Sequence, residues 1–405
     1  MSEFKRIPIV VFTGAGASRA EPICLPTMFE FFQQIMNENR QPKSARITNK
    51  TYFKFIFDAI YGDNDNYDLE RIMDALYHMT DFTKSDNWGV FMHPEIYDNV
   101  FNAVTSRIPS NYYAQIKSNI QPSITNTFEK RKKEASTLAR ELEDLIREKY
   151  EDISFENIQK VYAHFFEWLT IINKTVSQAP IIPFFTTNYD MSIDWFFYPR
   201  YKNERAPQQK WLRTNNINMI DGFINQEWDS QNFDVINEAD NAGVIFIPYY
   251  KLHGSLYWEE VAGTLRRNST IARDPHLQQK LMIIYPSDKK LLTQDPYYFS
   301  HRALDSYLAR TDNLLIIGFS FRDPAIVQSF QYALNYNRGL SIHIVIPTGD
   351  SEIPGEVADF INVNNGRVKH INKYFGNKDC LDAINQSIGL IPEVPPAVRR
   401  RRRVQ

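Results

Sequence analysis

Short apolar runs that end in polar or glycine-containing turns recur along this chain. The run Ile7–Phe12 is rich in β-branched residues and is followed by a glycine loop, which predicts a buried parallel strand. Similar runs follow at wide intervals, separated by stretches with helical patterning. Alternation of this kind indicates an α/β fold built on a parallel sheet. The other predicted strands are Ile181–Phe185, Val244–Leu252, Leu314–Ile317 and Ile342–Ile346.

Residues 28–177 follow a different pattern. Apolar residues recur there at helical spacing in three separate series, and Asp68 stands where it would cap the first predicted helix. Because this segment lies between the first two predicted strands, we expect a large helical insertion within one domain spanning residues 1–390. The series are Leu69, Ile72, Met73, Leu76 and Met79; Leu138, Leu142, Leu145 and Ile146; and Ile158, Val161, Tyr162, Phe165, Leu169 and Ile172.

Composition narrows the class of protein. A hydrophobic fraction of 43% and a charged fraction of 23% are those of a globular protein, while 14% aromatic residues suggest a large core or a subunit interface. The formal charge of -2 gives no general attraction to nucleic acid or membrane. Residues 391–405 combine prolines with the arginine run Arg399–Arg403 and are expected to be disordered. This tail is either a solvated extension or a local contact for nucleic acid or an acidic partner.

The two cysteines argue against cysteine-based sites. Cys24 and Cys380 are far apart and no CxxC pair occurs, so neither a cysteine zinc site nor a disulfide framework is expected. The first apolar run breaks at Thr13, which makes it too short for a signal peptide or a membrane span. We therefore expect a cytoplasmic protein without membrane contact.

The first predicted strand ends in the loop Gly14-Ala15-Gly16-Ala17-Ser18. Glycines let the backbone approach a phosphate closely, and a following helix would offer free N–H groups. Arg19 stands where the dinucleotide-binding fingerprint has its third glycine. The loop is therefore either a phosphate site or a plain tight turn between strand and helix.

Polar residues close the next strands in the same way. Asn188 and Asp190 follow the second strand, where α/β sheets bind ligands, but either residue could instead cap a helix over Met191–Phe197. His253, followed by Gly254, could relay a proton or serve a structural role.

The fourth motif follows the strand Leu314–Ile317. Gly318 and Ser320 could meet a phosphate there. Asp323 precedes Pro324, which predicts a helix cap rather than a catalytic carboxylate.

Taken in order, the segments GAGAS, TTNYD, KLHGS and GFS resemble the signatures of the sirtuin family, which are a GAG-S loop, T-x-N-x-D, HG and G-x-S. The resemblance implies a Rossmann-like parallel sheet of sirtuin type that binds NAD. By position, Asn188 and Asp190 would face the nicotinamide ribose and His253 would be its general base. The family cleaves the nicotinamide glycosidic bond through an oxocarbenium-like state, chiefly by positioning and by excluding other nucleophiles. The diphosphate would lie on Gly14, Ala15, Gly16 and Ser18, and the adenosine side on Gly318 and Ser320.

Three departures from the sirtuin pattern refine this expectation. Residues 255–317 contain no cysteine, so the four-cysteine zinc module of deacylating sirtuins is missing and no metal is expected. The family sequence G-I-P-D-F-R is replaced by Cys24–Met28, and the helical insertion exceeds what a deacetylase needs. These departures resemble bacterial sirtuin-like effectors of anti-phage defence, which hydrolyse NAD with water. The resemblance implies an NAD glycohydrolase with Asn188 and His253 as catalytic residues and NAD as substrate.

The same resemblance implies an assembly that keeps the enzyme inactive until infection. We expect a homo-oligomer formed through the aromatic-rich insertion, and a HerA-type DNA-translocating ATPase as partner. Two other functions remain open: a zinc-free NAD-dependent protein deacylase, and a non-catalytic NAD or ADP-ribose sensor within a nuclease or ATPase complex. Retention of both Asn188 and His253 argues against the sensor, because a pure binding module does not need the histidine.

Overall fold

The protein divides into two compact units, Met1–Thr27 with Tyr150–Gln405, and Met28–Lys149. The helix α7 (Phe155–Val176), which lies in the segment expected to form the insertion, belongs to the first unit. The computed structural model describes residues 7–36, 42–61, 69–80, 113–151, 153–176, 181–197, 212, 214–237, 244–261, 263–267, 280–283, 295–348, 353–364 and 366–390.

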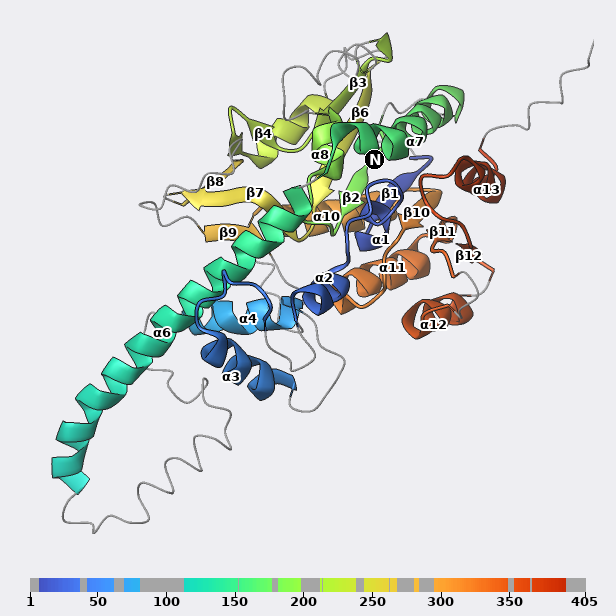
Figure 1. Cartoon of the computed structure of the whole chain (residues 1–405). Coiled ribbons are helices and arrows are strands. Elements are labelled where there is room, and N and C mark those ends of the chain that lie inside the picture. Colours follow the sequence, from blue (N-terminus) through green and yellow to red (C-terminus); the bar gives the residue numbers. More distant parts are fainter. Residues whose placement is uncertain are drawn as a thin grey trace, which may run out of the picture. The chain divides into compact units, whose positions relative to one another are not determined.

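The first unit is built on a seven-stranded sheet in the order β12-β11-β10-β1-β2-β6-β3, in which every neighbouring pair is parallel (Figure 1). The expected α/β fold with a parallel sheet is therefore confirmed. Five strands match the predicted runs to within a few residues, while β3 and β12 were not predicted. The strands are β1 (Val10–Thr13), β2 (Phe184–Thr186), β3 (Ile217–Ile220), β6 (Ile245–Lys251), β10 (Asn313–Ile317), β11 (Ser341–Val345) and β12 (Val368–Ile371).

Prolines explain why two strands begin later than their apolar runs. Pro8 and Pro183 have no N–H to donate, so regular pairing starts only after each of them. Ile7 and Ile181 before them make isolated bridges to Thr311 and Phe246. The predicted starts at these two isoleucines were therefore too early.

Helices cover both faces of this sheet, which explains why its strands read as continuous apolar runs. Phe184 points to one face, where it contacts Phe165 and Phe166 of α7. Phe185 points to the other, where it stacks on Tyr250 with centroids 4.7 Å apart. On the first face α8 (Ser192–Phe197) packs beside α7, and α13 (Lys378–Ile388) packs against β11 and β12. The second face carries α10 (Tyr297–Leu308), α11 (Pro324–Tyr336) and α12 (Gly355–Val363).

A second, antiparallel sheet combines two strands that precede β6 with three that follow His253, and it was not predicted. Its strand order is β4-β5-β8-β7-β9 (Figure 1). Four of its strands have only two to four residues and β7 is partly polar, so none shows the continuous apolar run that marks the parallel strands. They are β4 (Phe223–Ile224), β5 (Glu227–Trp228), β7 (Gly254–Val261), β8 (Thr264–Arg267) and β9 (Lys280–Ile283), and the 3-10 helix η4 (Ser230–Asn237) leads from β5 toward β6.

The second unit is helical over its described residues. It contains α2 (Met28–Ile35), α3 (Lys50–Tyr61), α4 (Leu69–Thr80) and most of α6 (Tyr113–Glu151). The three helical series predicted from spacing are confirmed as helices α4, α6 and α7, and their described apolar residues are buried except Leu145, which is half-buried. Asp68, the side chain of Met79 and the tail 391–405 lie outside the described residues.

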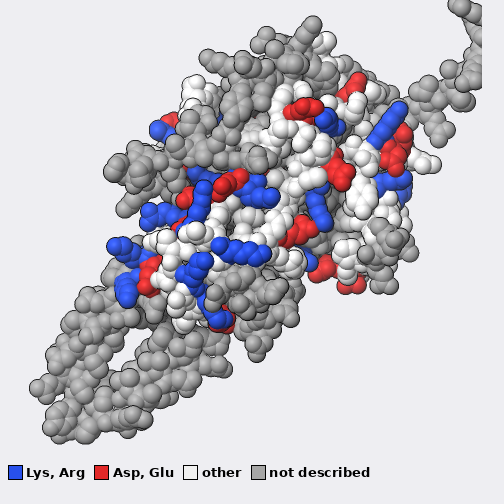
Figure 2. Space-filling view, in the orientation of Figure 1, with Lys and Arg blue, Asp and Glu red and all other residues white. Residues whose placement is uncertain are grey.

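Charges of both signs occur on the face of the protein that Figure 2 shows. Basic and acidic side chains are interspersed there. None of the helices in the described ranges is long and apolar enough to cross a bilayer.

Candidate functional site

Four adjacent strands bring the four predicted motifs to one edge of the parallel sheet. Thr13 of β1 lies level with Ile317 of β10 and with Thr186 of β2, and Thr186 lies level with Lys251 of β6. Because all four strands run the same way, the residues after them meet at the carboxyl edge, where open α/β sheets bind ligands.

The loops of the first and fourth motifs contact each other closely, and this contact requires glycine at positions 16 and 318. Gly16 donates its N–H to the carbonyl oxygen of Gly318 at 2.9 Å, and a Cβ on Gly16 would lie 2.7 Å from the Gly318 Cα. Gly318 itself has a φ of +65°, and a Cβ there would lie 2.4 Å from the Ala17 nitrogen. Close packing of two loops thus accounts for these glycines, and their contact with a phosphate stays a prediction. The helix α1 (Ala15–Ser18) that follows Gly14 is only one turn long.

Ser18, Asn188 and Asp190 form a buried hydrogen-bonded cluster between the first two loops. The Ser18 hydroxyl donates to Asp190 Oδ2 at 2.7 Å, and Asn188 Nδ2 donates to Ser18 Oγ at 2.9 Å. Asn188 Oδ1 is buried and has no hydrogen-bond partner among the described residues. An unsatisfied buried acceptor costs about 1–3 kcal/mol, so a hydroxyl donor from a ligand would be stabilised there.

Asp190 also stabilises the start of the next helix. A helix cap was one of the two roles that the sequence left open for it. Its Oδ1 accepts the N–H of Ser192 at 2.8 Å, and α8 starts at that residue rather than at Met191. Burial, and then the charge of Asp190, hold the pKa of the nearby Tyr162 well above its ordinary value. One carboxylate therefore serves both the helix start and the polar cluster.

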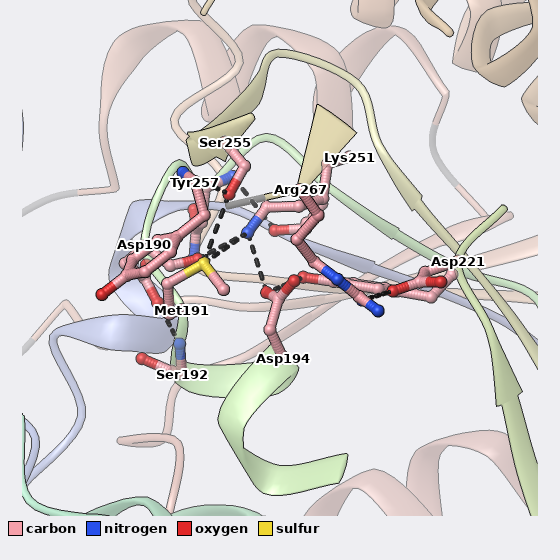
Figure 3. Close-up of polar contacts among 12 residues, drawn as sticks. Asp190, Met191, Ser192, Asp194, Asp221, Lys251, Ser255, Tyr257 and Arg267 are labelled. Atoms are coloured by element: carbon pink, nitrogen blue, oxygen red, sulfur yellow. Dashed lines mark hydrogen bonds and ion pairs between the residues drawn. The ribbon is translucent and has the colours of Figure 1, made fainter. Parts of the chain in front are cut away.

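Lys251, fully buried at the end of β6, holds this loop through hydrogen bonds (Figure 3). Its Nζ donates to the main-chain oxygen of Asp190 at 2.6 Å and to Asp194 Oδ2 at 2.8 Å. The Tyr249 hydroxyl donates to the same Asp194 oxygen at 3.2 Å. Burial, followed by the Asp194 charge, raises the pKa of Tyr249 well above its ordinary value, so its hydroxyl remains a donor. The ammonium neutralises a buried carboxylate and fixes the segment that carries Asp190.

A second ion pair near this loop joins the two sheets. Arg267 at the end of β8 pairs with Asp221, which directly follows β3 (Figure 3). Burial raises the pKa of Asp221, and the Arg267 charge acts in the opposite direction. Neither residue was singled out from the sequence, because a strand of two to four residues gives no register that would place them together.

His253 is bound to a carboxylate that the sequence did not assign to it. His253 Nε2 lies 2.8 Å from Asp323 Oδ2, and the two side chains are each only 4% exposed. Asp323 Oδ1 accepts the N–H groups of Ala325 at 3.0 Å and Ile326 at 3.3 Å. The prediction that Asp323 caps a helix is confirmed, because it is the N-cap of α11. Its second role was missed, since a separation of 70 residues leaves no local signal.

Exposure separates the candidate residues into two groups. Ser18, Asn188, Asp190 and His253 are buried, whereas Ala15 and Ser320 are exposed. The side chains proposed to react are therefore buried, whereas Ala15 and Ser320 face the surface. Within the described parts of the chain, no group of three or more His, Cys, Asp or Glu residues could hold a metal ion. Cys24 and Cys380 are both free thiols.

Comparison with known proteins gives one family match, over part of the chain. Residues 183–362 match the family model described as a SIR2-like domain. Comparison with curated proteins gives no match. Among solved structures, similar chains include a Sir2 homologue–NAD complex at 12% identity, covering 95% of this chain and 91% of that chain with a TM-score of 0.37. Another is a mutant Sir2 homologue with 2'-O-acetyl ADP ribose, at 10% identity, covering 96% and 95% with a TM-score of 0.37.

The matched span agrees with the sirtuin resemblance of the motifs. It contains Asn188, His253 and Gly318, whereas the first glycine loop precedes it.

Proposed function

We propose that this chain binds NAD at the carboxyl edge of its parallel sheet and hydrolyses the nicotinamide–ribose bond, releasing nicotinamide and ADP-ribose. The observation that carries the proposal is the buried polar cluster of Ser18, Asn188 and Asp190. Asn188 and Asp190 follow β2, which pairs with β6, the strand that His253 follows. The SIR2-like match over residues 183–362 supports NAD as the substrate.

Asn188 fits a ribose in this site. Its buried Oδ1 lacks a partner among the described residues, and a ribose hydroxyl or a water molecule is a donor of the right kind. Its Nδ2 is already held by Ser18, so the amide is fixed in the orientation that presents the oxygen. Asn188 would therefore orient the ribose hydroxyls or the attacking water.

His253 supplies the proton acceptor. In hydrolysis, the oxygen of water bonds to the ribose carbon while the bonding pair of the broken C–N bond passes to nicotinamide, which leaves neutral. One proton from the water must then be taken up, and His253 would accept it near neutral pH. Little acid catalysis is needed, because the positive charge is already on the leaving group.

The remaining residues would hold the substrate. The exposed backbone at Ala15 and half-buried Gly16 would contact the diphosphate, with Gly14 and Ser18 completing that loop. Gly318 and exposed Ser320 would hold the adenosine side. Burial of Asn188, Asp190 and His253 strengthens their electrostatic interactions and excludes stray nucleophiles.

The sequence resemblance supports a role in anti-phage defence, in which NAD depletion stops the infected cell. Such an effector acts in an assembly, and we propose self-association through the helical unit together with a HerA-type ATPase partner. Phe55 on α3 is an apolar side chain of this unit that is 55% exposed. Co-purification with the ATPase and mass photometry test this assembly. Truncation at Ala397 tests whether the arginine tail contributes to it.

The function is tested by incubating the purified chain with NAD and separating the products by chromatography, with and without an acylated peptide. Nicotinamide and ADP-ribose without peptide support a hydrolase. Turnover that requires the peptide would instead identify a deacylase. Binding measured by calorimetry without turnover, even with the ATPase present, would identify a sensor.

A further inference from the structure

The contact between His253 and Asp323 spans the width of two strands. His253 follows β6 and Asp323 follows β10, and the order β10-β1-β2-β6 places β1 and β2 between them. At ordinary strand spacing the ends of β6 and β10 lie about 14 Å apart. The five-residue step from Gly318 to Asp323 spans at most about 17 Å. The chain after β10 must therefore cross this distance to bring the two side chains within 2.8 Å.

The two oxygens of Asp323 have separate partners, and this fixes the proton between Asp323 and His253. Oδ1 accepts two N–H groups at the start of α11, where the helix dipole favours negative charge. An ionised carboxylate has no proton to donate, so the ring nitrogen that faces Oδ2 must carry it. Neutral His253 is therefore protonated on Nε2, and the lone pair of its ring lies on Nδ1.

We propose that Asp323 is the positioning residue of His253, holding the ring in the Nε2–H tautomer so that Nδ1 accepts the substrate proton. When that proton arrives, the ring becomes an imidazolium whose charge the buried carboxylate balances. The inference rests on the proposed function only for the identity of the proton donor, a water molecule or a ribose hydroxyl. The tautomer itself is a property of the chain alone.

Replacement of Asp323 by asparagine tests the tautomer directly. Asparagine caps helices as well as aspartate does, and its single oxygen must stay on the N–H groups of Ala325 and Ile326. Its NH₂ group then faces His253 Nε2 and requires that nitrogen to accept. Asp323→Asn is thus expected to move the proton from Nε2 to Nδ1 while α11 remains capped.

The experiment is long-range ¹⁵N–¹H spectroscopy of the full chain labelled on its 8 histidines, with His253 assigned from a His253→Gln variant. The wild type should show His253 protonated on Nε2, and Asp323→Asn should show it protonated on Nδ1. Asp323→Ser provides a second variant that caps α11 but is too short to reach the ring, and it should give a mixture. His343, which bonds Asn313 and Ser387 elsewhere, serves as the internal control and should not change.

Kinetics supply a second measurement. The kcat of Asp323→Asn would not change if Asp323 served only as a helix cap. Asp323→Asn should lower kcat about 10⁴-fold, the loss seen when a triad carboxylate becomes an amide, with KM changed less than about threefold. An unchanged tautomer in Asp323→Asn, or a wild type protonated on Nδ1, would overturn the proposal even if NAD is hydrolysed. A tautomer switch in a chain that does not turn over NAD would uphold the positioning role and count against the proposed function.

Discussion

Asp190 and Asp323 divide their carboxylates in the same way, with one oxygen on a helix start and the other on a polar side chain of the candidate site. Asp190 accepts from the Ser192 N–H with Oδ1 and from the Ser18 hydroxyl with Oδ2. Asp323 accepts from the first N–H groups of α11 with Oδ1 and contacts His253 with Oδ2. The starts of α8 and α11 are thereby coupled to the geometry of the site, so capping and site geometry are not separate alternatives for these residues.

Lys251→Met is expected to destabilise the fold strongly. The substitution leaves Asp194 buried without its cation, which costs about 3–5 kcal/mol of unfolding free energy. Denaturant titration followed by tryptophan fluorescence measures it. Lys54→Met is the matched control, because the pair of Lys54 and Asp58 is half exposed and should contribute at most about 1 kcal/mol. Equal losses in the two variants would show that the buried pair has no special role.

Gly318→Ala tests the contact between the first and fourth loops. Gly318 has φ +65° and its added Cβ would lie 2.4 Å from the Ala17 nitrogen, so backbone strain and overlap should together cost at least about 3 kcal/mol. Gly366→Ala has the same kind of backbone, with φ +91°, but meets nothing within 4 Å. It should lose only about 1–2 kcal/mol in the same denaturant titration. A Gly318→Ala protein as stable as Gly366→Ala would contradict the close approach.

His343 gives the fold a defined acid sensitivity. Burial, and then the charge of Lys369, lower the pKa of His343 from 6.5 to about 4. Between these values the unfolded chain binds a proton that the folded chain does not, so stability falls as the pH drops from 7 to 5. The loss is about 2 kcal/mol.

The matching experiment compares urea unfolding at both pH values for wild type and His343→Gln. The variant should lose about 2 kcal/mol less than the wild type over this interval, whatever its stability at pH 7. His164→Gln, which changes an exposed histidine on α7, should keep the wild-type difference. Identical pH dependence in wild type and His343→Gln would contradict the assignment.

The sequence predicted the parallel sheet because strands buried on both faces, such as β1 and β10, are continuous apolar runs. The sequence also predicted that Asn188 and His253 lie at one edge of the sheet, because polar residues that follow neighbouring parallel strands meet at the carboxyl edge. It could not predict the antiparallel strands β4, β5, β7, β8 and β9, because four of them have only two to four residues and β7 is partly polar. The missed functional residues were Lys251 and Asp323. In the local sequence, Lys251 is a lysine at the end of a strand and Asp323 is a helix cap. Their partners become apparent only from the order of the strands in the sheet.

The central claim is tested most directly by NAD turnover in wild type, Asn188→Ala and His253→Ala, with the exposed His164→Ala as control. Wild type and the control should release nicotinamide and ADP-ribose at equal rates. Asn188→Ala and His253→Ala should lower kcat at least about 100-fold, with unchanged denaturant midpoints. Wild-type turnover retained in both site variants would contradict the assignment of this edge of the sheet as the active site.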